Sequence, residues 1–256
     1  MPNNCMNYLN VKGKYVDILK FIKGTHSVGT EYEMPRYRLS FENIKATPIK
    51  ENGEIIEEWY DWRIKNWDTK WDLYDEFGHI TVGNIIIDTH DKKFNFKHLD
   101  EICQNKEVEA EYQLGFCTAW SPAMSIYEKL AEDYNDLDLT FKVQYDEGGC
   151  AFAGHIKFNK GEIIEDVYVD VCKDPINYYE YLLENEIEDI DYLLENMFSS
   201  VEEDYENETD EFRTKLFNKL QEVMKSEKAN NRGRAKLYVD VCLKAKENIK
   251  AIEGDK

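Results

Sequence analysis

The sequence lacks several features that mark common functional classes. It contains no run of about 18 apolar residues, so we expect no transmembrane helix. The opening Met1–Cys5 has no basic stretch followed by an apolar one, so no secretory signal peptide is expected. Basic residues are scarce, since 32 Lys and Arg stand against 52 Asp and Glu, for a formal charge of -20. Binding to nucleic acid or to an anionic membrane needs basic surface, so both are disfavoured. The scattered cysteines, without a disulfide pattern, predict a reduced, cytoplasmic protein.

Cysteine and histidine patterns that would signal a metal or a disulfide framework are also missing. No C-x-x-C pair occurs, and no histidine pair has the spacing of zinc ligands. We therefore expect reduced core thiols and neither a metal nor a cofactor, although acidic surface can bind hard divalent cations weakly. The residues concerned are Cys5, Cys103, Cys117, Cys150, Cys172 and Cys242, and His26, His79, His90, His98 and His155.

The negative charge is concentrated in one stretch of the chain. Residues 162–211 hold 19 Asp and Glu but a single basic residue, Lys173. Residues 212–256 reverse the balance, with 12 Lys and Arg against 6 Asp and Glu. Such asymmetry is informative about partners and solubility rather than about fold.

The first half of the chain alternates between strand and helix patterns. The alternation of Cys5, Asn7, Leu9 and Val11 with the residues between them predicts a strand over 5–11. Helical spacing predicts a helix over 15–22 that ends at Gly24. Residues 25–37 contain Gly29 and Pro35 and are predicted to be a loop. Short strands are predicted over 41–48 and 80–87, and residues 88–107 have weak helical character.

From residue 112 onward the pattern describes a strand, a helix and a meander. A strand buried on both faces is predicted over 112–120, and Ser121-Pro122 is predicted to cap the next helix. Three strands follow, with turns at 147–149 and 159–161. Beyond Pro175 the apolar period lengthens to about 3.5, which predicts three helices with heptad seams at 183–201 and 235–252.

This order of elements predicts an α+β fold. A strand–helix–strand prefix followed by a strand–helix–strand–strand block fits a ferredoxin-like antiparallel sheet with insertions. We predict a ferredoxin-like α+β domain over 1–172, followed by an acidic all-α helical segment over 173–256.

Four sequence blocks resemble the Api92-like family, which has a YubB-type ferredoxin-like domain. They are Met1–Leu9, Asn66–Asp72, Phe116–Pro122, and Tyr145–Gly148 with Phe152–Gly154, and they occur in the family's order over residues 1–154. The family's version of the second block reads N-W-G-T-K-W-D. The resemblance implies a ferredoxin-like domain and a phage or plasmid setting, and it implies no reaction or catalytic residue.

Two departures from the family pattern are visible within these blocks. Asn4 stands where the family tends to have Trp, and Asp68 stands where it tends to have Gly.

The tryptophan-rich blocks are one candidate site. Four of the five tryptophans lie within residues 59–71. Polar groups among indoles suit a base, a nucleotide or a peptide, which favours a ligand-binding or enzymatic module. The plainer interpretation is packing, with Lys70 stacked on an indole and the polar groups capping a turn. The predicted pocket consists of Asn66, Trp67, Lys70, Trp71, Trp120 and Tyr145.

No catalytic residue is predicted. Ser121 lies at a strand-to-helix turn but lacks the glycines of a G-x-S-x-G elbow, so helix capping explains it better. Glu147 could act as a general base at a hairpin tip, but a turn with solvated carboxylates is the simpler explanation.

The acidic stretch is the other candidate site. It exceeds the charge that solubility needs, which is about 2–8 per small domain. Its helical face could imitate a phosphate track and inhibit a basic, nucleic-acid-handling partner such as a host defence nuclease, without itself contacting nucleic acid or membrane. Two simpler interpretations are a solvated face and self-association through the heptad seams. The predicted partner-binding residues are Glu180, Glu184, Glu188, Asp191, Glu195, Glu202, Glu203 and Asp204.

Overall fold

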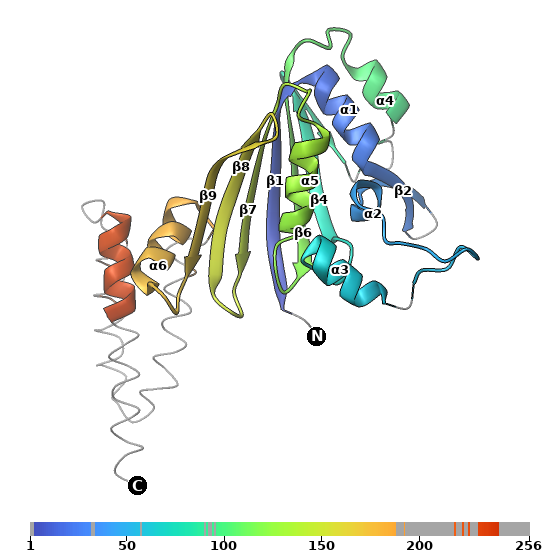
Figure 1. Ribbon diagram of the computed structural model, residues 1–256. Helices are drawn as coiled ribbons and strands as arrows, with labels where there is room; N and C mark the ends of the chain where they lie inside the picture. Colours follow the sequence, from blue (N-terminus) through green and yellow to red (C-terminus); the bar gives the residue numbers. More distant parts are fainter. Residues whose placement is uncertain are drawn as a thin grey trace. The chain divides into compact units, whose positions relative to one another are not determined.

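A computed structural model describes most of the chain (Figure 1). The described residues are 3–31, 34–56, 58–89, 91, 94, 96–187, 192, 218, 222, 225 and 230–240. By its internal contacts the chain divides into two compact units. The first unit comprises Met1–Cys150 with Gly154–Tyr168, and the second comprises Ala151–Ala153 with Val169–Lys256.

A seven-stranded sheet has the order β5-β4-β6-β1-β7-β8-β9, and its strands lie wholly or mostly in the first unit. The central β1 pairs antiparallel with both β6 and β7, which brings the start of the chain between two later segments. The fold is therefore α+β with a large antiparallel sheet, as the alternating pattern predicted. The strands are β1 (Asn4–Lys14), β4 (Tyr74–Val82), β5 (Ile85–Asp88), β6 (Glu109–Ala119), β7 (Leu139–Glu147), β8 (Phe152–Asn159) and β9 (Glu162–Asp170).

Two helices, α1 (Tyr15–Thr25) and α5 (Met124–Asp133), pack on one face of this sheet (Figure 1). Their apolar stripes meet the inward residues of β1, β6 and β7 in a single core, of which Phe21, Tyr112 and Phe141 form an aromatic centre. Shorter helices α2 (Phe41–Ile44), α3 (Trp59–Trp67) and α4 (Phe96–Ile102) complete this layer. Burial of such side chains contributes about 1.5–3 kcal/mol each.

The opposite side of the central strands carries the alternate residues, and we call it the open face. The strand register aligns these residues in rows that cross β4, β6, β1 and β7. One row consists of Phe77, Gly115, Tyr8 and Gln144, and the next consists of His79, Gln113, Asn10 and Lys142.

Three sequence predictions about local structure were wrong. Residues 25–37 contain strand rather than only loop, because β2 (His26–Glu31) and β3 (Met34–Leu39) pair as a two-stranded sheet. A two-stranded sheet tolerates Pro35, since a strand edge does not require every N–H. Residues 41–48 begin with the helix α2 instead of a strand. The strand predicted over 80–87 is a hairpin of β4 and β5, which turns at Gly83 with φ 57°.

The second unit contains α6 (Pro175–Glu184) and a helix over 231–240. The Asp174 side chain accepts a hydrogen bond from Asn177 N and Pro175 opens the helix, so α6 has a sequence-encoded start. The rings of Tyr179 and Tyr238 pack with centroids 4.3 Å apart. The rest of the predicted helical segment lies largely outside the described residues. None of the helices in the described residues combines the length and the hydrophobicity that a membrane span requires.

Candidate functional site

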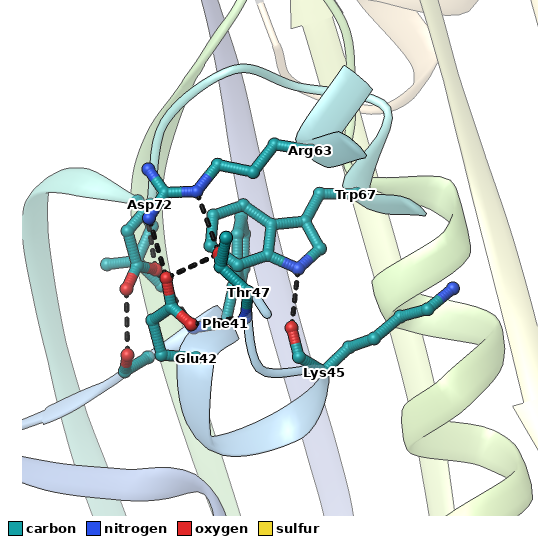
Figure 2. Close-up of polar contacts among 9 residues, drawn as sticks. Phe41, Glu42, Lys45, Thr47, Arg63, Trp67 and Asp72 are labelled. Carbon is teal, nitrogen blue, oxygen red and sulfur yellow. Dashed lines mark hydrogen bonds and ion pairs between the residues drawn. The ribbon is translucent and has the colours of Figure 1, made fainter. Parts of the chain in front are cut away.

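The first tryptophan-rich block contains a cluster of polar and aromatic contacts around Trp67 (Figure 2). Trp67 is fully buried at the end of α3, where its indole N–H donates to Lys45 O at 2.7 Å. The Arg63 guanidinium lies 4.4 Å from the Trp67 ring centroid and pairs with Glu42 at 2.6 Å. The same guanidinium donates to Thr47 Oγ1 at 3.0 Å. These contacts fix the segment between β3 and β4 on the core, so Trp67 does not line an accessible pocket.

The polar members of the same block also serve the backbone. Asp72 accepts hydrogen bonds from Ser40 Oγ, Phe41 N and Leu73 N, at 2.7–2.9 Å. Asn66 Nδ2 donates to Trp62 O within α3 at 2.8 Å. The packing interpretation therefore accounts for both residues.

Hydrogen bonds join two segments that overlap the tryptophan-rich blocks, residues 68–72 and residues 118–125. Thr69 Oγ1 bonds both Ala119 O and Ala119 N, at 3.2 and 3.0 Å. Asp68 has the left-handed φ of 63°, and its carboxylate accepts from Ser125 N at 2.7 Å. Left-handed backbone is the conformation that Gly adopts without strain, so the family's Gly suits this position.

The prediction that Ser121 caps the following helix was wrong. Helix α5 begins at Met124, and its first-turn N–H group is capped by Asp68 from a distant part of the chain. Ser121 instead donates its hydroxyl to Asp68 O, so it holds the capping loop in place.

Three of the six predicted pocket residues come together. The Lys70 ammonium lies 3.7 Å from the Trp71 ring centroid and 4.4 Å from that of Trp120. The indoles are 39% and 40% exposed, and Trp120 has a φ of 71°, which is unusual for a bulky side chain. Because the Lys70 ammonium already contacts both rings, cation–π packing accounts for this cluster.

Tyr145, the sixth predicted pocket residue, lies on β7 and is buried. Gly154 provides the space for its hydroxyl, since a Cβ on Gly154 would come 2.5 Å from that oxygen. Burial raises the pKa of the phenol well above its usual value, so Tyr145 stays neutral.

The acidic candidate site lies mostly outside the described residues. Glu184 is exposed, whereas Glu180 pairs with Arg232 at 2.5 Å and is thereby neutralised within its own unit. The other predicted partner-binding residues lie outside the described part: Glu188, Asp191, Glu195, Glu202, Glu203 and Asp204. No group of His, Cys, Asp and Glu in the described part could hold a metal ion.

A cavity of about 280 Å³ lies on the open face of the sheet, at a place that sequence reasoning missed. Its walls include the rings of Tyr8 and Phe77 and the polar side chains of His79, Gln113 and Lys142. These residues occupy the outward positions of four strands, which read in the sequence as ordinary solvent-facing positions. Only the register across β4, β6, β1 and β7 brings them together.

Electrostatics distinguish Lys142 from the other lysines of this face. Lys12 pairs with Glu111 at 3.4 Å, and Lys157 pairs with Glu165. Among the described residues, no carboxylate lies within ion-pair distance of Lys142. Burial and the nearby Lys157 lower the pKa of Lys142, because both disfavour its charged form.

Residues 97–191 match the family model described as the ferredoxin-like domain in Api92-like protein, so this segment carries that domain. The segment contains β6, α5, β7, β8, β9 and α6, and two of the four sequence blocks lie in it. The resemblance is thus confirmed for this segment. The sequence blocks placed it over residues 1–154, whereas the matched segment runs from 97 to 191. The blocks at 1–9 and 66–72 precede the matched segment. No curated protein and no solved structure matches the chain.

Proposed function

We propose that this protein is a non-catalytic binding protein that accommodates a planar, anionic ligand on the open face of its sheet. The observation that carries the proposal is the cavity in which two exposed aromatic rings lie near Lys142, which forms no ion pair within the described residues. Sites for small ligands combine apolar walls with a few polar groups that fix orientation. This places the ligand away from the tryptophan-rich blocks, whose polar groups are engaged in holding the fold.

The cavity's chemistry selects the ligand by two features together. A ring gains contact with Tyr8 and Phe77, and an anion can pair with the Lys142 ammonium, whose charged form is disfavoured by burial and by Lys157. An uncharged ring would contact only the aromatic residues, and a small anion would contact only Lys142.

A thermal-shift survey tests this proposal. The panel contains an aromatic carboxylate, an aromatic sulfonate and a nucleoside monophosphate, with an uncharged aromatic and inorganic phosphate as matched controls. At about 100 times Kd a ligand stabilises by about 2.7 kcal/mol, which raises Tm by several degrees. We expect the shift only for compounds with both features. The proposal fails if no such compound raises Tm, or if the controls raise it equally.

The acidic stretch supports a second candidate function. Its 19 carboxylates in residues 162–211 favour attachment to a basic, nucleic-acid-handling protein of the host cytoplasm, with inhibition of that protein as the outcome. In this proposal the chain is a phage or plasmid product that acts against host defence by imitating DNA. Pull-down from host lysate at low and high salt tests it. A basic partner captured only at low salt is expected, and recovery of none contradicts it.

A further inference from the structure

We propose that the ligand of the open-face cavity is a free nucleoside monophosphate, with its base against Tyr8 and Phe77 and its phosphate at Lys142. This inference rests on the proposed binding function and specifies its ligand.

The base end is an aromatic surface that the sheet itself positions. The rings of Tyr8 and Phe77 pack in a T-shaped arrangement with centroids 6.4 Å apart. The two residues are 40% and 52% exposed. Gly115 lies between them in the register, and a Cβ there would come 2.2 Å from the Phe77 ring. The missing side chain lets the Phe77 ring lie against the sheet. Every base has a π-face, so such a surface stacks bases in general.

The neighbouring row supplies groups that can recognise a base edge. Asn10 and Gln113 both donate to Glu111, which orders their amides. The imidazole of His79 is half-buried and has no hydrogen bond or ion pair within the described residues. Proteins read unstacked bases through hydrogen bonds of this kind to their polar edges. A simple aromatic anion would leave this polar row unused.

The phosphate end is the opposite end of the same row. Lys142 is separated from His79 by β6 and β1, and strands lie about 4.8 Å apart, so the row spans roughly 14 Å. That length suits a base, a sugar and a phosphate in line. The charged groups around Lys142 are Lys12, Lys157 and Glu165. Because Lys157 and Glu165 already form a pair, a phosphate meets a net positive environment.

The negative charge of the whole chain favours a free nucleotide over a single-stranded nucleic acid as the ligand. A single strand adds one phosphate per nucleotide and meets the field of a protein with formal charge -20. A monophosphate brings its negative charge only to Lys142. The ligand expected at this site is therefore a free nucleotide.

Calorimetric titration of the full chain tests the proposal. The ligands are AMP, GMP, CMP and UMP, with adenosine, inorganic phosphate, an aromatic carboxylate and an eight-residue oligouridylate. At least one monophosphate should bind about tenfold tighter than adenosine and phosphate, because a charge-assisted hydrogen bond is worth about one decade.

Variants divide the site into its two ends. K142Q should weaken the monophosphate about tenfold and leave adenosine unchanged, and F77A should weaken both about tenfold. Exposed residues outside the cavity provide matched controls, K97Q for charge and I164A for apolar area, and both should bind like the wild type. Circular dichroism confirms that each variant is folded.

Each other outcome overturns the inference. If the aromatic carboxylate binds through Phe77 and no nucleotide binds, the ligand class is wrong while the proposed function stands. If neither binds, both fall. Tighter binding of the oligouridylate than of UMP would show that the ligand is a single-stranded nucleic acid. Equal loss of monophosphate and adenosine affinity in K142Q would show that Lys142 does not hold the phosphate.

Discussion

The cap that Asp68 places on α5 yields the sharpest prediction about stability, because its backbone and side-chain contributions can be separated. The Asp68 carboxylate accepts from Ser125 N at the start of α5, where the helix dipole also favours an anion. Removing a cap costs about 1–2 kcal/mol. The left-handed φ of 63° adds about 1 kcal/mol for alanine, whereas glycine is free of that cost.

The expected order of unfolding free energy is therefore wild type and D68N highest, then D68G, then D68A. D68A should lose about 2–3 kcal/mol and D68G about 1 kcal/mol, while D68N retains an acceptor and loses about 0.5 kcal/mol. Urea unfolding followed by tryptophan fluorescence is the assay, since all five tryptophans lie in the first unit. D68A as stable as the wild type, or less stable D68G than D68A, would refute the reasoning.

Two further predictions concern buried polar groups. Burial lowers the pKa of His26 to about 3. Between about pH 6.5 and 3 only the unfolded state binds the proton, so the free energy of unfolding decreases as the pH is lowered. At pH 5 the loss relative to pH 7 should be about 2 kcal/mol, and H26Q should remove this part of the slope in urea unfolding across pH. The Tyr127 hydroxyl donates to buried Asn7 Oδ1 at 2.7 Å, so Y127F should cost about 1–3 kcal/mol. An unchanged urea midpoint in Y127F would contradict this.

The sequence was most informative where a strand alternates and buries one face. The pattern of β1 and β7 is visible because every second residue is apolar, apart from Asn7 in β1, and the helix α5 shows a clear stripe. Helix α3 was missed because its residues are mostly polar or aromatic and only Trp67 is buried. Its position depends on tertiary contacts such as that of Arg63 with Glu42.

The candidate site could be predicted only in part for a related reason. The tryptophan-rich motif is conspicuous in the sequence, but its members differ in burial, since Trp67 is buried and Trp71 is exposed. The cavity depends on a register between strands that are far apart in the chain, such as β1 and β7. No local pattern distinguishes Lys142 from a solvent-facing lysine, because whether it pairs with a carboxylate of the described residues depends on its neighbours in space.

The most direct test of the binding account is a nuclear magnetic resonance titration of the labelled chain with a nucleoside monophosphate. The account predicts that amide shifts concentrate at residues 8–10, 77–79, 113–115 and 142–144, which line the cavity across four strands. Shifts confined to the Lys70, Trp71 and Trp120 cluster, or no saturable shifts in the first unit, would contradict it.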